Sequence, residues 1–185
     1  MVIAHYGFSN YVLVFGIVTT SCKEVFPHCN LKSASSMESA ISMDQQLPSL
    51  CILKFALSMG WCCISSEGSP PVLGATNFRR SLSSLHAEVE AFIWAMRCMI
   101  RHDFRDVAFL TDCSDLVKMV SSPIDWPAFA TYLDDIRIDK EEFSSFSLIY
   151  VSRNANVRAD SLARQARVSP HHVLFVDNFP PNWLV

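Results

Sequence analysis

The stretch Val107-Ala-Phe-Leu-Thr-Asp112 is a continuous apolar run that ends in a carboxylate. A short apolar run with acids at both ends, here Asp106 and Asp112, is typical of a central strand that is covered on both faces. Such strands belong to α/β sheets with helices on the two faces. The carboxyl end of the strand is the place where open α/β sheets form their binding crevices.

Helices and strands are predicted on both sides of this run. Apolar residues recur at three- and four-residue intervals after Ser83 and Ser84, which predicts a capped helix extending to about Arg101. The segments after the run are predicted as a helix over Asp115–Val120, a helix over Ala128–Glu142, a strand over Phe146–Val151 and a helix over Val157–Arg167. Asn156 is expected to cap the last helix. The last two strands are expected to be parallel, joined by a right-handed crossover.

A β-hairpin is predicted before the first helix. Trp61–Ile64 and Val72–Phe78 are apolar runs separated by Ser, Gly and Pro residues, as two strands and their turn would be. An earlier strand is predicted over Cys51–Leu57. Together these segments predict an α/β fold in which antiparallel hairpin strands and parallel strands share one mixed sheet with helices packed on it.

The N-terminal part of the chain has a different character. The run Tyr11–Val18 is apolar but far shorter than the ~20 residues that span a bilayer. Three interpretations are open: a signal peptide, although no Lys or Arg precedes the run, a buried strand, or a poorly ordered start. Ser33–Ser49 lacks clear periodicity and is interpreted as a linker. We therefore expect a poorly defined extension or linker over residues 1–49, a domain over 50–168 and a tail over 169–185.

The composition excludes several classes of protein. Of 185 residues, 50% are hydrophobic and 18% are charged, which indicates one folded domain rather than a disordered or fibrous chain. The net charge of −3 does not support strong, sequence-independent attraction to nucleic acid, so any such role requires a local site. The seven cysteines contain no CxxC pair, which favours reduced core thiols. We expect an intracellular protein, with nucleus and cytoplasm both open.

Three acidic residues fall at positions where a shared site is expected. Glu88 lies at the edge of the apolar stripe of its helix, Asp112 ends a strand, and Asp160 lies near the start of the last helix. If that first helix packs beside the strand, the three carboxylates converge and repel each other unless a cation neutralises them. Mg²⁺ prefers such oxygen ligands. Each acid also has a simpler interpretation, as an ordinary residue of a helix start or a turn.

Three motifs follow one another in a specific order. They are Ser84-Leu-His-Ala-Glu-Val-Glu-Ala91, Phe109-Leu-Thr-Asp-Cys-Ser114 and Val151-Ser-Arg-Asn-Ala-Asn-Val-Arg-Ala-Asp-Ser-Leu-Ala163. They resemble the three later motifs of ribonuclease H-like domains, and are most similar to the reverse-transcriptase-associated branch of non-LTR retroelements that is abundant in plant genomes. Gly60-Trp61 is similar to the second strand of that branch, so the resemblance covers roughly Cys51–Arg167. His86, inside the first motif, is interpreted as a packing or capping residue rather than a base.

The resemblance implies a ribonuclease H-like fold and hydrolysis of the RNA strand of an RNA–DNA hybrid with two divalent ions, Mg²⁺ or Mn²⁺. Glu88, Asp112 and Asp160 match the acids that bind the metal ions and carry the catalysis. Asn156 and Arg153 match the loop that enters the last helix, and are expected to contact the substrate. Nucleic acid is then the expected partner, and we expect a monomer without membrane attachment.

The first strand departs from the family pattern. That strand usually carries an Asp about a dozen residues before the Gly-Trp pair, and no such signature precedes Gly60. If Cys51–Leu57 is the strand, Lys54 stands at about the acid's position and the hairpin is shortened; otherwise Asp44 is the only nearby acid. Loss of an acid that bridges the ions is expected to abolish two-metal chemistry. The alternatives to an enzyme are a catalytically inactive hybrid-binding module or degenerate retroelement remnant, and a small interaction domain with incidental acids.

Overall fold

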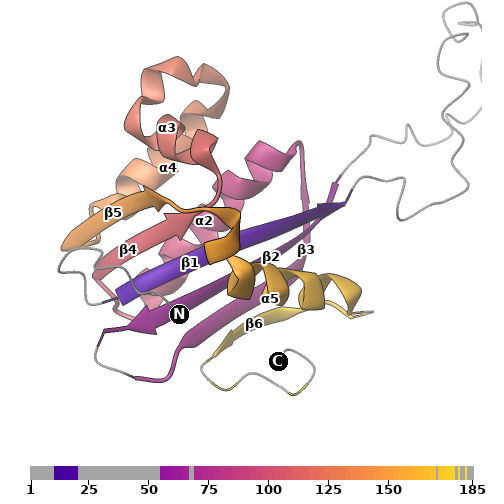
Figure 1. Ribbon diagram of the computed structural model, residues 1–185. Coiled ribbons are helices and arrows are strands. Elements are labelled where there is room, and N and C mark those ends of the chain that lie inside the picture. Colours follow the sequence, from indigo (N-terminus) through magenta and orange to yellow (C-terminus); the bar gives the residue numbers. More distant parts are fainter. Residues whose placement is uncertain are drawn as a thin grey trace, which may run out of the picture.

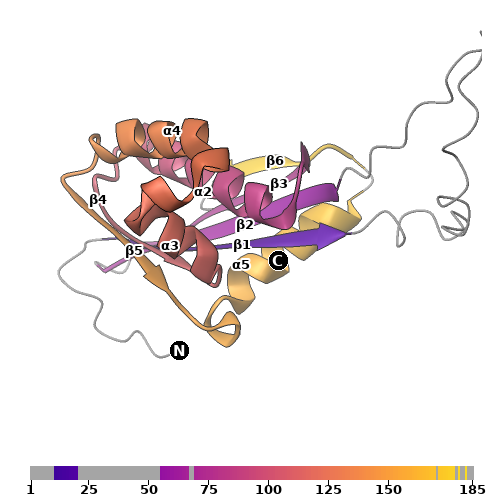
Figure 2. The same ribbon diagram turned by 90° about the horizontal axis from the view of Figure 1, so that it is seen from above.

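The computed structural model describes residues 11–20, 55–66, 69–169, 171–177, 179 and 182. They form a six-stranded sheet with the strand order β5-β4-β1-β2-β3-β6 (Figure 1). The strands are β1 (Tyr11–Thr20), β2 (Phe55–Ser65), β3 (Val72–Ser81), β4 (Asp106–Thr111), β5 (Ser145–Tyr150) and β6 (Leu174–Asp177). Seen from above, β5 and β6 lie at opposite edges of this sheet (Figure 2).

Strand β1 joins the antiparallel part of the sheet to the parallel part. It pairs antiparallel with β2 on one side and parallel with β4 on the other. On the antiparallel side, β3 pairs with both β2 and β6, and on the parallel side β5 pairs with β4. The hairpin of β2 and β3, the parallel pair of β4 and β5, and the mixed α/β sheet are confirmed as predicted.

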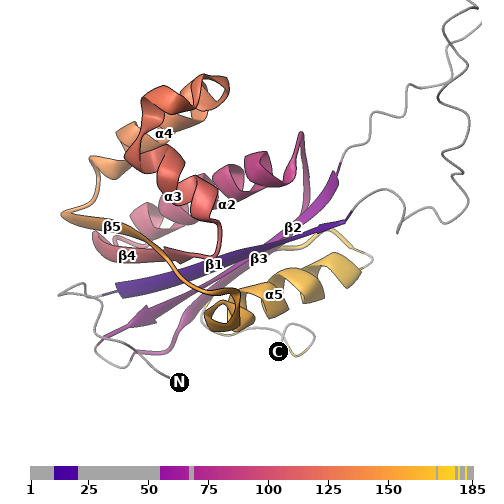
Figure 3. The ribbon, with the colours of Figure 1, turned by 45° about the horizontal axis from the view of Figure 1, so that its top comes forward.

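Helices cover both faces of the sheet. They are α2 (Ser84–Arg101), α3 (Ser114–Ser121), α4 (Ala130–Lys140) and α5 (Val157–Val168), with 3-10 turns η2 (Pro123–Asp125), η3 (Pro127–Phe129) and η4 (Arg153–Ala155). Figure 3 shows α2, α3 and α4 on one face and α5 on the other. Helix α5 contacts β1, β2 and β3, so it covers the middle and the antiparallel part of the sheet.

The two faces bury separate cores because successive residues of a strand point to opposite sides. Phe15 of β1 packs toward α2, where its ring lies 5.4 Å from that of Phe92. Cys63 belongs to the same core, whereas its neighbour Cys62 belongs to the core beneath α5, with Leu162. Both thiols are free, as are those of Cys98 and Cys113.

The predicted helices are confirmed, with one difference in length. Ser83 caps α2 by accepting a hydrogen bond from the backbone nitrogen of His86 at 3.2 Å. The helix predicted over Ala128–Glu142 is shorter, because α4 begins only at Ala130. Two 3-10 turns precede it, and each begins with a proline, Pro123 or Pro127. Proline lacks a backbone N–H and is tolerated in the first turn of a helix but not in its interior.

The first strand of the sheet is Tyr11–Thr20, so the prediction that Cys51–Leu57 takes this role is wrong. Strand β1 pairs with β2 from Tyr11 opposite Ser65 to Thr20 opposite Ala56. Residues 55–57 are already part of β2, where they pair with β3 as well, and they cannot also form the strand before it. Of the three interpretations of the apolar run, a buried strand is the one found.

The connection between β1 and β2 runs over residues 21–54. The prediction of a shortened hairpin is therefore wrong, because this connection is long. Lys54 and Asp44, the two residues considered for the position of the missing acid, lie outside the described residues. The division of the chain at residue 50 does not coincide with the edge of the sheet, since β1 precedes it.

The C-terminal segment adds the edge strand β6 beside β3. Asn77 of β3 fixes the approach to this strand. Its Nδ2 donates to the carbonyl oxygens of Ala166 and His171, at 2.8 and 2.9 Å, and its Oδ1 accepts from the nitrogen of Val173 at 2.8 Å. Part of the segment predicted as a tail is therefore docked on the sheet. None of the helices in the described part of the chain is long and apolar enough to cross a membrane.

Candidate functional site

Three elements bring acidic residues toward one end of the sheet. Asp112 directly follows β4, Asp160 lies in the first turn of α5, and Glu88 lies one turn into α2. The side chains of Asp112 and Asp160 are only 14% and 9% exposed. Since α2 and α5 lie on opposite faces, the end of β4 is where residues from both faces meet.

Hydrogen bonds fix the chain at the end of β4. The nitrogen of Val151 donates to the carbonyl oxygen of the buried Thr111 at 2.8 Å, which extends the pairing of β5 with β4 by one residue. The hydroxyl of Thr111 accepts from the nitrogen of Cys113 at 3.1 Å. The chain turns at this point and begins α3 at Ser114. The backbone on both sides of Asp112 is therefore fixed, and Asp112 lies at the end of the buried strand β4.

The carboxyl group of Glu88 is strongly perturbed. Burial, followed by the negative charges of Asp112 and Asp160, raises its pKa from 4.5 to about 8, and Arg153 opposes the rise. Burial and the charge of Asp112 also raise the pKa of Asp160, against the effect of Arg153 and Arg164. The mutual effects place the three acids within electrostatic reach of each other. Such repulsion is the condition under which a cation binds favourably.

Arg153 is the cation that the structure places between two of these acids. Its Nε lies 3.6 Å from Oδ2 of Asp112 and 3.8 Å from Oδ2 of Asp160. These distances are those of ion pairs and are longer than hydrogen bonds. The side chain is 75% exposed, so most of the guanidinium faces solvent. The structure thus places this predicted substrate-binding residue against the predicted metal ligands.

Asn156 is fully buried and holds two other parts of the site together. Its Nδ2 donates to the carbonyl oxygen of Phe15 in β1 and to Oδ1 of Asp112, both at 2.7 Å. Both partners only accept hydrogen bonds, so the orientation of the amide is determined. The side chain makes no capping hydrogen bond to α5, so that prediction is wrong, although Asn156 stands at the N-cap position. In this position Asn156 orients Asp112, and its amide N–H groups are already committed.

The register of β1 identifies the position where the missing acid was expected. Val14 pairs with Leu110 of the parallel strand β4, the last pair of this ladder, and the same register continued by two residues leads to Gly16 in β1 and to Asp112 after β4. Gly16 also pairs with Gly60, where an added Cβ would collide with the backbone of α5. The residue at this position is a glycine, and β1 contains no Asp or Glu at any other position.

The residues present do not fit a pair of metal ions. Their chemistry suits a cation, since Oε2 of Glu88 is buried without a hydrogen-bond partner among the described residues, and carboxylate oxygens are preferred ligands of Mg²⁺. However, the described segments contain no group of three or more His, Cys, Asp or Glu side chains that could hold an ion. Arg153 stands between two of the acids, and Gly16 supplies no ligand.

His86 has a structural position, in agreement with its interpretation as a packing residue. Its Nδ1 lies 2.8 Å from the hydroxyl of Ser83, and its ring lies 4.4 Å from that of Phe129.

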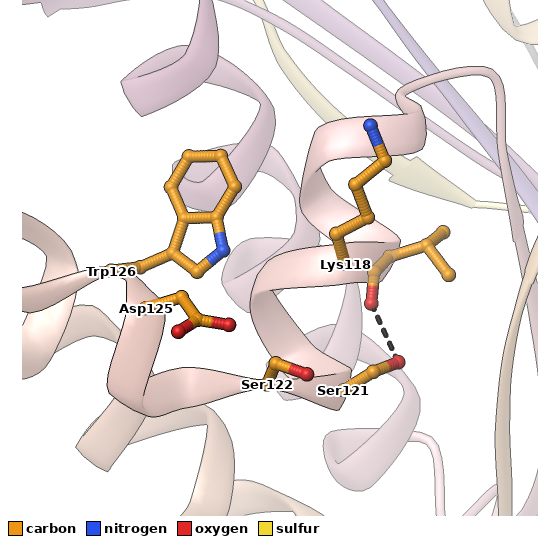
Figure 4. Close-up of a pocket in the computed structure, with 6 residues that line it drawn as sticks. Lys118, Ser121, Ser122, Asp125 and Trp126 are labelled. Atoms are coloured by element: carbon orange, nitrogen blue, oxygen red, sulfur yellow. Dashed lines mark hydrogen bonds between the residues drawn. The ribbon is translucent and has the colours of Figure 1, made fainter.

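A separate pocket, open to solvent, lies at the far end of α3 from Asp112 (Figure 4). It is lined by Val117, Lys118, Ser121, Ser122, Asp125 and Trp126. None of the three site acids lines it, so it is not part of the site.

The sequence indicated neither the position of Gly16 nor the contacts that Arg153 and Asn156, both predicted as site residues, make with Asp112. A glycine in an apolar strand carries no chemical signal, and its importance appears only from the register with β4. The ion pairs of Arg153 depend on how the η4 turn lies against Asp112. The burial of Asn156 follows from the same packing, and a buried Asn needs acceptors for its two N–H groups.

A model of the family described as reverse transcriptase-like matches residues 56–166. The matched segment begins in β2 and ends in α5, so it contains Glu88, Asp112 and Asp160 but not β1. A comparison with curated proteins finds no match.

Solved structures with low sequence identity share the fold. RNase H1 from the halophilic archaeon Halobacterium salinarum NRC-1 has a TM-score of 0.60 at 19% identity, covering 84% of this chain and 96% of that one. LC11-RNase H1 in complex with an RNA/DNA hybrid has a TM-score of 0.55 at 13% identity, covering 84% and 95%. The foamy viral protease-reverse transcriptase in complex with dsDNA has a TM-score of 0.56 at 12% identity, covering 87% and 96%. These similarities show a ribonuclease H-like fold.

Proposed function

Because this chain belongs to the reverse transcriptase-like family, we propose that it is a ribonuclease H-like domain that binds RNA–DNA hybrids without hydrolysing them. The observation that carries this proposal is the first strand of the sheet, Tyr11–Thr20, which contains no Asp or Glu although it pairs with the strand that leads to Asp112. Two-metal hydrolysis depends on ions that stabilise both the attacking and the leaving oxygen. The acids that remain do not fit two ions, so binding is the activity that this site supports.

The charge distribution around α5 supports a nucleic-acid partner. Arg158, Arg164 and Arg167 are exposed on this helix, and Arg153 is exposed in the turn before it, whereas Asp160 is buried. Residues 152–169 thus carry four positive charges and one negative charge, in a chain whose net charge is −3. Guanidinium groups bind phosphate oxygens in a bidentate manner. The helix therefore offers a local phosphate-binding surface that the overall composition hides.

A hybrid duplex is the proposed ligand for two reasons. Among the structural neighbours, LC11-RNase H1 was solved with an RNA/DNA hybrid and the foamy viral enzyme with dsDNA. In addition, a hybrid is recognised through the shape of its minor groove and its 2′-hydroxyl groups rather than by base reading. That mode of binding does not require a broadly basic protein.

Fluorescence anisotropy with a labelled hybrid tests the proposal. We expect binding that weakens as salt increases and that is tighter than to dsDNA of the same sequence. Replacing Arg164 and Arg167 by Ala should weaken hybrid binding severalfold. Arg101→Ala, at an exposed arginine outside α5, is the matched control and should leave binding unchanged. Absence of hybrid binding at low salt would contradict the proposal.

Hydrolysis of the RNA strand is the second candidate. The observation that favours it is that Oε2 of Glu88 is buried and unpartnered among the described residues, in a chain that retains Glu88, Asp112 and Asp160. It requires the site to hold ions despite the absence of an acid at position 16. The two candidates differ in one outcome, the survival of the RNA strand in the presence of Mg²⁺.

Lineage, compartment and oligomeric state belong to the same proposal. The order of the three acidic motifs supports descent from a non-LTR retroelement of the plant type. The free, buried thiols of Cys62, Cys63 and Cys98 support a reducing, intracellular compartment. For the oligomeric state we propose a monomer.

A further inference from the structure

We propose that Arg153 is the resident counter-ion of the acidic site and takes the place of a metal ion there. This inference uses the proposed function only to locate the site. It follows from the observation that the residues of this site do not fit the metal ions that the fold family implies. The consequence is that the domain folds, and keeps its carboxylates in place, without a divalent cation.

The position of Arg153 is the first support. Its Nε lies within 4 Å of carboxylate oxygens from two different elements, Asp112 after β4 and Asp160 in α5. Among the described residues it is the only basic side chain that forms an ion pair with either acid. A cation between two acids from separate elements relieves their mutual repulsion and links the elements.

The backbone at Arg153 is fixed, which is the second support. The η4 turn is closed by hydrogen bonds from Ala155 nitrogen to Ser152 oxygen at 2.8 Å and from Asn156 nitrogen to Arg153 oxygen at 3.1 Å. Three residues after Arg153, the buried amide of Asn156 donates to Asp112. One short turn therefore supplies Asp112 with both a neutral donor and a positive charge.

A divalent ion and Arg153 compete for the same carboxylates. An ion bound by Asp112 and Asp160 would lie close to the guanidinium, and the two positive charges would repel each other. Arg153 is 75% exposed, so solvent screens most of this repulsion, and the part that is left is the part that weakens metal binding while the side chain stays paired. Removing the guanidinium should therefore increase metal affinity by a factor on the order of ten.

The test compares the wild-type chain with Arg153→Ala, Arg153→Lys and Arg158→Ala. Thermal unfolding is measured in EDTA and in millimolar Mn²⁺ or Mg²⁺, and Mn²⁺ affinity is measured by titration calorimetry. We expect no metal-dependent rise in the melting temperature of the wild type. Arg153→Ala should melt lower than the wild type in EDTA, regain stability with Mn²⁺, and bind Mn²⁺ about tenfold more tightly.

The other two variants separate charge from shape and position. Arg153→Lys keeps the positive charge and should respond to metal like the wild type. Arg158 is exposed on α5, the helix that carries Asp160, and forms no ion pair with these acids, so Arg158→Ala should show the wild-type response to metal. If Arg153→Ala does not fold in EDTA, Arg153→Gln, which retains the length of the side chain and a donor, replaces it in the same comparison.

Equal metal responses in the wild type and Arg153→Ala, or its replacement Arg153→Gln, whether both absent or both present, would overturn the assignment. The melting and titration experiments contain no nucleic acid. Failure of the chain to bind a hybrid would therefore overturn the proposed function only. The role of Arg153 is decided separately, by the melting and titration results.

Discussion

Among the residues of the site, Glu88 should make the stability of this domain depend most strongly on pH. Its pKa is raised from 4.5 to about 8, first by burial and then by Asp112 and Asp160. Between these two values the folded chain keeps a proton that the unfolded chain has released. Stability therefore decreases as pH rises from about 4.5 to about 8, with a contribution of at most ~1.4 kcal/mol per pH unit.

Glu88→Gln should remove this contribution. We expect the free energy of unfolding of the wild type to fall between pH 5 and pH 8, and that of the variant to fall less, because its neutral amide has no charge to bury. Urea unfolding at several pH values measures both. Glu141→Gln, at an exposed acid, serves as the control and should keep the wild-type slope. Parallel pH profiles for the wild type and Glu88→Gln would show that the carboxyl is not perturbed.

Asn156 is expected to be a positioning residue whose loss is costly. Asn156→Ala leaves the carbonyl of Phe15 and a carboxylate oxygen of Asp112 without their donor. Unsatisfied buried groups cost about 1–3 kcal/mol each, so we expect a loss of at least that size in urea unfolding. Asn154→Ala, at an exposed residue of the same turn, should change stability by less than about 0.5 kcal/mol. A variant at position 156 as stable as the control would contradict this role.

At the scale of elements, Gly60 sets the distance between β2 and α5. A Cβ at this position would lie 2.7 Å from the nitrogen of Ala163 and 3.0 Å from Cβ of Leu162, and would collide with the carbonyl of Ala159. Gly60→Ala must therefore push α5, and Asp160 with it, away from the sheet. Overpacking of this kind costs about 1–3 kcal/mol.

Thermal or urea unfolding of Gly60→Ala measures that cost. Ser161→Ala, on the exposed face of α5, is the matched control because it changes the helix without touching the sheet. We also expect Gly60→Ala to weaken hybrid binding, since α5 carries the proposed phosphate-binding arginines. Wild-type stability in Gly60→Ala would mean that the close approach of β2 and α5 is absent in solution.

Elements whose signals are local were predictable from the sequence. The apolar spacing after Ser83 located α2, and the run ending at Thr111 located β4, because each pattern lies within one element. Strand β1 was open to three interpretations because its partners lie far along the chain. The short spacing expected before Gly60 falls on residues 44–54, whereas the connection over residues 21–54 separates β1 from β2.

The site was predictable only in part for a related reason. Glu88, Asp112 and Asp160 belong to recognisable motifs, and their identity required no coordinates. The positions of Arg153 and Asn156 relative to Asp112 depend on how a short turn packs against the end of β4. Contacts of this kind are tertiary, so no periodicity or spacing in the sequence encodes them.

At the scale of the whole molecule, β1 is indispensable because it lies inside the sheet. A fragment over residues 50–185 would leave β2 and β4 unpaired along one edge each and would lose the buried side chains of Leu13 and Phe15. Each such side chain contributes about 1.5–3 kcal/mol, against a typical domain stability of 5–15 kcal/mol.

We therefore expect the fragment over residues 50–185 not to fold, and a fragment over residues 11–185 to fold like the full chain. Circular dichroism and cooperative urea unfolding distinguish these states. A cooperative transition in the shorter fragment would show that the domain is complete without β1, as the division at residue 50 implied.

The measurement that tests the absence of two-metal catalysis most directly is incubation of the wild-type chain with an end-labelled RNA–DNA hybrid in millimolar Mg²⁺ and, separately, in Mn²⁺. Binding is verified in the same samples, and Glu88→Gln serves to identify activity from a contaminating nuclease. We expect a bound hybrid whose RNA strand remains full length. Cleavage of the RNA strand by the wild type that disappears in Glu88→Gln would contradict the proposal, because it would mean that the three remaining acids suffice for hydrolysis despite Gly16 and Arg153.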